Sequence, residues 1–166
     1  MNCVTARIDN SSIGLPRGYV YLIFSRFPNA LYIGQTRSEL GALGRLSQHL
    51  SQTDSNTFLK RVAQRHRLDD VTLSDIVFLA IDLPREKRFE GPSSEYREAI
   101  EGAVHLSFLK HICHKGLGAP LVSNYRINGY SRHAEIEALA EDIARFFFHE
   151  ITPHLSHSSA SRSALE

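Results

Sequence analysis

Two short apolar runs that carry tyrosines constrain the fold of this chain more than any other feature. Residues 18–25, GYVYLIFS, are aromatic and β-branched, which is typical of a buried strand. Residues 31–35, LYIGQ, predict a second strand, and the RFPN between them contains the proline and asparagine common in turns. The pattern predicts an antiparallel hairpin. Because alternate side chains of a strand share a face, Tyr21 and Tyr32 can lie on the same face of it.

The rest of the chain predicts one more strand and four helices. The segment 37–44, RSELGALG, interrupts them as a loop, and the charged PREKRFEGP before the long helix is a second loop. The predicted elements are a short helix from Gly44, a helix over 55–68 with Ser55 as its cap, a strand over 73–83, a long helix from 93 to 114, and an amphipathic helix over 132–151.

The length of 166 residues predicts one domain with additional terminal elements. The last residues, SHSSASRSALE, are of low complexity and are expected to be disordered. The predicted organisation is an N-terminal arm at 1–17, a main domain at 18–130, a C-terminal helix at 131–152 that packs on the domain or forms a dimer, and a disordered tail at 153–166.

Composition favours a cytoplasmic protein that does not enter a membrane. No run approaches the roughly 18 apolar residues of a membrane span, and the first residues lack the apolar stretch of a signal peptide. Cys3 and Cys113 are two isolated cysteines, which form neither a disulfide framework nor a zinc knuckle. We therefore expect reduced thiols and a cytoplasmic location.

The distribution of charge is more informative than the net charge of +1. Residues 35–67 carry 6 basic and 2 acidic side chains, and residues 105–133 carry 4 basic and none acidic. Residues 68–104 carry 4 basic and 9 acidic side chains. A basic surface beside an acidic cluster is typical of a protein that binds a polyanion and holds a metal nearby, although ordinary surface variation explains the blocks equally well.

Four features, which follow one another along the chain, are candidates for a catalytic site, and each also has a purely structural explanation. The hairpin tyrosines could simply be packing residues. Arg45 and His49, at i and i+4 in GRLSQHL, share one helix face that could be solvated. Glu101 lies at the margin of the apolar stripe of the long helix, where a carboxylate is costly unless it is paired or binds a cation. Asn124 follows in PLVSNYRINGY.

Together these features resemble the GIY-YIG nuclease family. Tyr32-Ile33-Gly34 matches the second tripeptide letter for letter, and Tyr19-Val20-Tyr21 stands at the first with Tyr replacing Gly. The resemblance covers about residues 18–126. It implies an α+β fold of the GIY-YIG type, in which a three-stranded antiparallel sheet is flanked by helices, here with an extra C-terminal helix. It also implies hydrolysis of phosphodiesters with one divalent metal.

The resemblance implies a role for each matched residue. Tyr21 or Tyr32 would orient or deprotonate the attacking water, and Arg45 would stabilise charge on the phosphate. Glu101 would hold Mg²⁺, for which Mn²⁺ can substitute, with Glu95 and Glu98 as alternative ligands. His49 would relay a proton or bind the phosphate, and Asn124 would position the scissile strand.

Departures from the family pattern concern the neighbourhood of the tyrosines. Many relatives have Lys after the second Gly, where this chain has Gln35, so His49 or the metal must lower the tyrosine pKa instead. The loop at 37–44 is an insertion that could contact the substrate. The predicted nucleic-acid-binding residues are Gly34, Gln35, Arg37, Lys60, Arg61, Arg65 and Arg126.

The predicted function is restriction-type cleavage of double-stranded DNA by a metal-dependent endonuclease. The expected partners are DNA and a possible second copy of the chain, with no small-molecule cofactor. One alternative is a nuclease specific for single strands or for DNA structure. Another is a nucleic-acid-binding module without catalysis.

Overall fold

The computed structural model describes residues 11–51, 57–68, 71, 73–115 and 121–158. The predicted strands and most predicted helices are present in the predicted order. The elements are η1 (Ser11–Gly14), β1 (Tyr19–Phe27), β2 (Ala30–Thr36), α1 (Gly41–Leu50), α2 (Thr57–His66), β3 (Ser74–Asp82), α3 (Lys87–Glu90), α4 (Glu95–His114), η2 (Gly129–Arg132) and α5 (Ala134–Ser158).

The three strands form one antiparallel sheet in the order β2-β1-β3, which confirms the predicted hairpin and the α+β class. The pairing places Tyr21 of β1 opposite Gly34 of β2, and Ile23 opposite Tyr32. Because side chains alternate along a strand, this register puts Tyr21, Tyr32 and Gly34 on the same face of the sheet.

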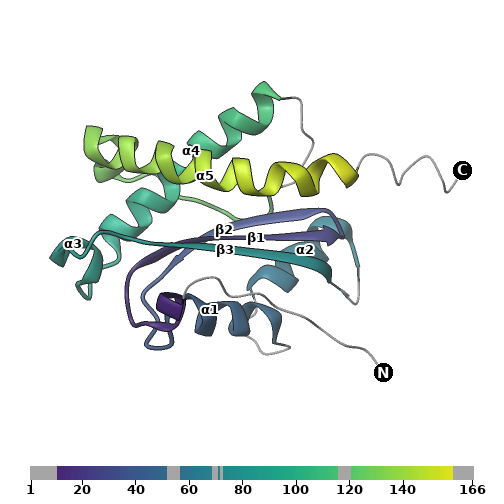
Figure 1. The fold of residues 1–166 in the computed structure, drawn as a ribbon, viewed down its shortest axis with the longest axis horizontal. Coiled ribbons are helices and arrows are strands. Elements are labelled where there is room, and N and C mark those ends of the chain that lie inside the picture. Colours follow the sequence, from purple (N-terminus) through teal and green to yellow (C-terminus); the bar gives the residue numbers. More distant parts are fainter. Residues whose placement is uncertain (1–10, 52–56, 69–70, 72, 116–120, 159–166) are drawn as a thin grey trace, which may run out of the picture.

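Helices cover both faces of the sheet. Figure 1 shows α4 and α5 on one side of the strands and α1 and α2 on the other. The α4/α5 side buries the larger core, which includes Leu22, Ile33, Ile100 and Phe147. The α1/α2 side buries a smaller cluster made of Tyr21, Ile23, Ala30, Tyr32, Phe58 and Val62. The hairpin tyrosines therefore belong to the smaller core, beside α1 and α2.

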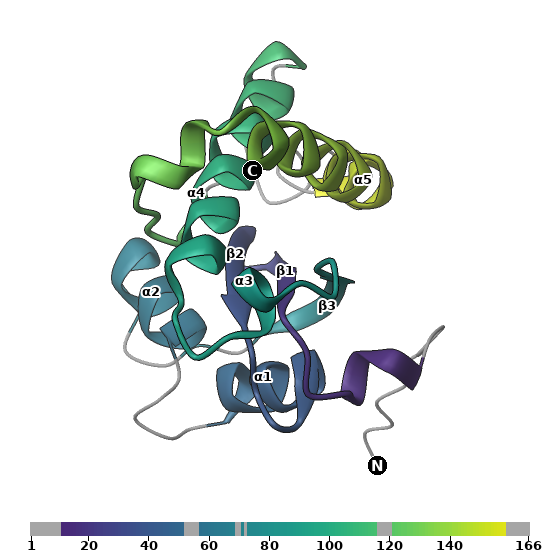
Figure 2. The ribbon, with the colours of Figure 1, turned by 90° about the vertical axis from the view of Figure 1, so that its left-hand side faces the viewer.

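The edge strand β2 lies where the two helical layers approach each other. In Figure 2, β2 is on the side of α2 and α4, and β3 is on the opposite side. The segment after α4 pairs with the first half of this edge, because the Val122 amide donates to the Leu31 carbonyl at 2.7 Å and the Ile33 amide donates to the Ser123 hydroxyl at 3.0 Å. Beyond Ile33 this segment makes no further described hydrogen bond to β2, and the candidate catalytic residues lie there.

Two predicted loops are wrong because part of each is helical. The loop predicted at 37–44 ends at Leu40, and α1 begins at Gly41 rather than Gly44. Gly41 has a φ of +61°, a left-handed conformation that glycine adopts readily, and a Cβ there would lie 2.4 Å from the Ile13 carbonyl oxygen. The charged loop after β3 contains the short helix α3, whose Phe89 is fully buried.

The boundary between the C-terminal helix and the predicted tail is also wrong. We predicted disorder from residue 153, whereas α5 continues to Ser158. The apolar stripe of Phe147 and Ile151 extends by one more turn to Leu155, which is buried, and this burial maintains the helix. The face of α5 that includes Ile143 and Phe147 packs on the core, so it is not free to form a dimer, whereas Phe146 is exposed.

The predicted cap Ser55 and the residues 1–10 of the N-terminal arm lie outside the described part of the chain. Within the described part, none of the helices combines the length and the apolar character needed to cross a membrane.

Candidate active site

Six side chains from five elements lie near one another beside β2. Tyr21 comes from the central strand and Tyr32 from the edge strand. The helices supply the rest, with Arg45 and His49 on α1, Arg61 on α2 and Glu101 on α4. Electrostatic effects connect the charged groups, since Arg45 and Arg61 both influence the pKa of Glu101. The fold thus brings five of the six predicted catalytic residues close to one another. Arg61, which was predicted to bind nucleic acid, lies with them.

The two tyrosine rings and Gly34 form the rigid part of the site. The rings of Tyr21 and Tyr32 lie nearly parallel, with centroids 6.2 Å apart and an interplanar angle of 14°. A Cβ atom on Gly34 would lie 2.4 Å from the Tyr21 hydroxyl oxygen and 2.9 Å from the ring of Tyr32. The absent side chain therefore makes room for Tyr21. The structure thus gives Gly34 a packing role, and its predicted contact with nucleic acid stays a prediction.

Gly34→Ala should displace the Tyr21 ring, because the new methyl group cannot share the space of the phenol. We expect a destabilisation of about 1–3 kcal/mol, typical of overpacking, together with a loss of any activity that depends on Tyr21. Thermal unfolding measures the first effect. Gly129→Ala is the matched control, because a Cβ there meets no atom within 4 Å. Equal unfolding temperatures for the two variants would contradict the packing argument.

His49 is fully buried and forms a hydrogen bond with the Tyr21 hydroxyl. The Phe58 amide donates to His49 Nδ1 at 3.3 Å, so the neutral ring carries its proton on Nε2. That Nε2–H donates to the Tyr21 hydroxyl at 2.8 Å. Burial, with Arg45 and Arg61 adding to it, lowers the pKa of His49 to about 3, so the ring is neutral near pH 7. The predicted roles of His49, to relay a proton or to bind the phosphate, stay predictions; in this structure its two ring nitrogens contact the Phe58 amide and the Tyr21 hydroxyl.

Arg45 supplies the positive charge next to the tyrosines. Its Nε–H donates to the Tyr21 hydroxyl at 3.3 Å, and its terminal nitrogens donate to the side chains of Gln48 and Thr57. Burial opposes its charge, but the phenols of Tyr21 and Tyr32 outweigh that effect and raise the pKa of Arg45. Among the described residues, no carboxylate pairs with it, so its charge is available to an incoming anion. Arg45, rather than His49, is the protein cation that replaces the expected Lys.

These contacts define what the Tyr21 hydroxyl can do. A phenol has two lone pairs and one proton, and here both lone pairs accept, from His49 Nε2–H and Arg45 Nε–H. Burial, with Tyr32 adding to it, raises the pKa of Tyr21, while Arg45 lowers it. The resting phenol is therefore neutral and can only donate. If it loses its proton, the same two donors stabilise the phenolate.

Glu101 is a partly buried carboxylate that has no hydrogen-bond or ion-pair partner among the described residues. No described side chain donates a hydrogen bond to it or forms an ion pair with it. Burial, with Glu98 adding to it, raises the pKa of Glu101 to about 8, although Arg61 and Arg45 oppose this shift. A carboxylate in this state is suited to a hard divalent cation that keeps most of its waters. Among the described residues, no group of three or more His, Cys, Asp or Glu side chains is placed to hold a metal ion.

The raised pKa of Glu101 predicts a pH dependence of stability without divalent cations. Between its unfolded value of 4.5 and the folded value of about 8, the native state retains a proton that the unfolded chain releases. The unfolding free energy contributed by Glu101 therefore falls as pH rises through this window, by at most about 1.4 kcal/mol per pH unit.

The difference between wild type and Glu101→Gln isolates this contribution. His49 and His105 act in the opposite direction at lower pH, because their pKa values are lowered to about 3 and about 4. Denaturant unfolding in EDTA from pH 4.5 to 8 should show Glu101→Gln gaining stability relative to wild type as pH rises. A constant difference across this range would contradict the burial of the charge.

Apart from Gly34, the predicted nucleic-acid-binding residues separate into three groups. Arg61 is part of the site, since its guanidinium lies 5.7 Å from the centroid of Tyr32 and its Nη1–H donates to the Val122 carbonyl. Gln35 and Arg37 line a depression beside Arg45. The exposed residues, whose side chains have no described contact with the site, are Lys60, Arg65 and Arg126.

Asn124 is not joined to the other five predicted catalytic residues by any hydrogen bond in the described part of the chain. It is exposed and follows Ser123, which is buried. The segment nevertheless passes close to Glu101, because a Cβ on Gly102 would lie 2.3 Å from the carbonyl oxygen of Arg126. Asn124 is therefore near the site, without a defined role in it.

Three residues near the site were not predicted from the sequence. His105 Nε2 lies 2.6 Å from the Ser123 hydroxyl and its Nδ1 lies 2.9 Å from the Glu101 carbonyl oxygen. These contacts connect the catalytic turn of α4 to the segment that pairs with β2. Arg97, one helical turn before Glu101, is buried beside Gln35. The i, i+4 spacing of Arg97 and Glu101 was the available signal for Arg97.

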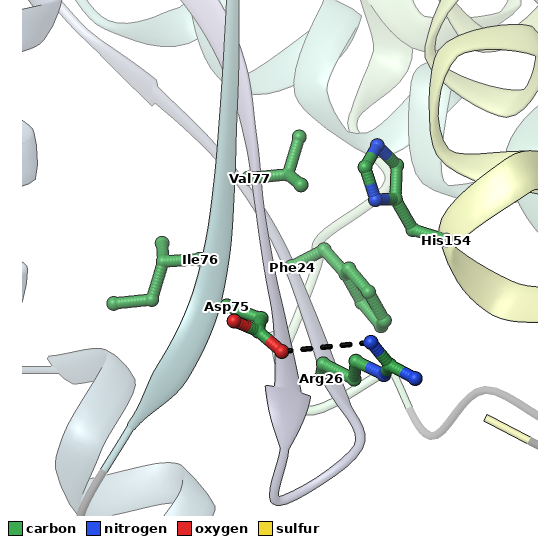
Figure 3. A pocket seen from close by; sticks show the side chains of 6 residues that line it. All are labelled: Phe24, Arg26, Asp75, Ile76, Val77 and His154. Carbon is green, nitrogen blue, oxygen red and sulfur yellow. Dashed lines mark ion pairs between the residues drawn. The ribbon is translucent and has the colours of Figure 1, made fainter. Parts of the chain in front are cut away.

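A second hollow, of about 300 Å³, lies on the α4/α5 side of the sheet (Figure 3). Phe24 and Val77 face His154 of α5 across it, while Arg26 and Asp75 form an ion pair at 3.6 Å. The charges of Arg26 and Asp75 therefore neutralise each other within the hollow. No candidate catalytic residue lines it. We place the candidate active site at the β2 edge.

Comparison with protein-family models, with curated proteins and with solved structures finds no significant match to this chain. The assignment of a function therefore depends on the residues and their geometry.

Proposed function

We propose that this protein is a metal-dependent DNA endonuclease of the GIY-YIG type that hydrolyses phosphodiester bonds in double-stranded DNA. One observation carries the proposal. Near β2 lie a phenol with two fixed donors on its oxygen and, among the described residues, an arginine without a carboxylate partner and a carboxylate without a hydrogen-bond or ion-pair partner. These are the groups needed to activate water, to stabilise phosphate charge and to hold a cation.

The residues divide the chemistry among them. Arg45 binds a non-bridging oxygen of the scissile phosphate, for which its planar fork is suited. Tyr21 would first release its phenolic proton to solvent, and the resulting phenolate, which Arg45 Nε–H and His49 Nε2–H stabilise, would then orient the attacking water and accept its proton. His49 stays neutral and keeps Tyr21 in place, and Tyr32 packs against both rings.

Glu101 would hold Mg²⁺ through its carboxylate, with water as the remaining ligands. The bound cation would supply Lewis acidity at the phosphate and at the leaving oxygen. Because no described arginine pairs with the Glu101 carboxylate, a bound cation would be the group that neutralises its charge.

The basic residues around the site support nucleic acid as the substrate. Arg61 lies inside the site, and Arg65 follows it by four residues on α2, so the two share one helix face. Such side chains contact the phosphate backbone and carry no sequence information. Because one active site cuts one strand, cleavage of a duplex favours two copies of the chain acting together.

Incubation with supercoiled plasmid and with single-stranded DNA, with and without Mg²⁺, tests the function. Discrete linear fragments that require the metal are the expected result. If only single-stranded DNA is cleaved, the protein is the single-strand-specific nuclease of the alternative hypothesis. Binding without cleavage under all metal conditions would contradict the proposal and favour a binding module.

A further inference from the structure

A shallow depression of about 380 Å³ adjoins Arg45 at the end of β2. It contains three arginines and no acidic residue. Its lining consists of Gln35, Thr36, Arg37, Ser38, Arg45, Gln48 and Arg97. Every one of these side chains can donate a hydrogen bond, and three of them carry a positive charge. The depression is therefore a surface for an anion.

Arg97 is the unusual member of this set. It is only 6% exposed, and it has no ion-pair partner among the described residues. Neutral oxygens hold it in place. Its Nη1 donates to the carbonyls of Phe89 and Gly91, both at 2.8 Å, and its Nε donates to Gln35 Oε1 at 3.3 Å. A buried cation without a counter-charge is costly, so its retention needs a compensating interaction.

Two arginines, Arg17 and Arg88, illustrate the usual pairing with a carboxylate. Arg17 contacts Asp82 at 3.2 Å and Arg88 contacts Glu86 at 2.6 Å. Arg97 differs from both, because it has no described carboxylate partner and shares the lining of the depression with a second cation, Arg37. Burial, with Arg37 adding to it, lowers the pKa of Arg97, while Glu90 and Glu98 oppose this without touching it. Arg37 itself reaches Glu90 only at 3.9 Å. A bound anion would relieve the repulsion between the two arginines.

The shape of the depression selects among anions. Small ligands are usually enclosed by concave pockets that bury most of their surface, and this depression is open. It is also continuous with Arg45, which belongs to the candidate active site. An extended polyanion that runs across both places fits this arrangement better than a free small molecule.

We propose that this depression binds a phosphodiester group of a nucleic-acid strand, next to the phosphodiester that lies at Arg45. Arg97 and Arg37 are its charged contacts. Gln35, which stands where Lys is expected from the resemblance, orients Arg97 through its amide oxygen. The proposal rests on the proposed function for the identity of the strand, but binding does not require cleavage.

Fluorescence anisotropy with a short DNA duplex in EDTA tests the proposal without catalysis. Arg37→Gln should weaken binding roughly five- to tenfold at low salt and reduce the slope of log affinity against log salt by about one. Arg37 is exposed, so this variant should fold. Arg97→Gln should have an effect at least as large, with its folding checked by thermal unfolding. Arg145→Gln on α5 is the control, since its partner Glu141 contacts His111, roughly 20 Å along α4 from Arg97.

Three outcomes would overturn the proposal. They are absence of binding by the wild type, equal affinities for Arg37→Gln and Arg145→Gln, and an effect of Arg37→Gln seen only with a 5′-phosphorylated duplex. The last would mean a site for terminal phosphates. An active nuclease whose Arg37→Gln variant binds normally would separate failure of this inference from failure of the proposed function.

Discussion

Glu101→Gln is expected to abolish metal-dependent cleavage of DNA while leaving the protein folded. The amide keeps the shape of the side chain but removes the charge that holds the cation. Since the metal contributes several kcal/mol to catalysis, the rate should fall by at least about a thousandfold. Thermal unfolding at pH 8 should show equal or greater stability, because a partly buried, unpaired carboxylate has been neutralised.

Glu98→Gln is the matched control for this variant. Glu98 lies on the same helix, one turn before Glu101, and accepts a hydrogen bond from Ser94 at 2.5 Å. Its replacement should change cleavage by less than about tenfold, as an interaction outside the reacting atoms does. If Glu98→Gln is the more damaging variant, the metal ligand is Glu98. If both retain full metal-dependent activity, no carboxylate at this turn holds the cation.

Tyr21→Phe is expected to reduce the cleavage rate by about 10²–10⁴-fold, as loss of a general base does. The phenyl ring keeps the packing over Gly34 and against Tyr32. The hydroxyl is lost, however, and His49 Nε2–H and Arg45 Nε–H then lack their acceptor. This should destabilise the fold by about 1–3 kcal/mol, which denaturant unfolding can measure.

Tyr32→Phe distinguishes the two tyrosines. If Tyr21 assists the nucleophile, Tyr32→Phe retains more activity than Tyr21→Phe at saturating Mg²⁺. The opposite order would assign the proton transfer to Tyr32 and leave Tyr21 as a positioning residue. Equal, complete loss with unchanged unfolding curves would indicate that the two phenols act as a pair.

The local part of the fold could be predicted from the sequence because it depends on neighbours along the chain. The hairpin of β1 and β2 follows from two short β-branched runs and a turn, and α4 follows from its apolar periodicity. The wrong boundaries occur where distant residues decide. Gly41 begins α1 in a left-handed conformation against the Ile13 carbonyl, and α5 passes residue 153 because Leu155 is buried in the core.

The candidate site was predicted as a set of residue types but not as a set of contacts. Tyr21, Arg45 and Glu101 were chosen by their chemistry and their order, and the fold brings them together. The burial of His49 could not be predicted, because the i, i+4 spacing with Arg45 is equally typical of a solvated face. Gly34 was assigned to the substrate, although Tyr21 occupies its space.

The sequence by itself determined the α+β class, the hairpin and the candidate catalytic residues, since periodicity and side-chain chemistry are properties of the chain. Only the tertiary structure decided which groups are satisfied and which are left unpaired. Phe58 sets the tautomer of His49, Gln35 orients Arg97, and no described residue neutralises Glu101. These relations join residues on different elements, and their energies depend on burial, which no local pattern encodes.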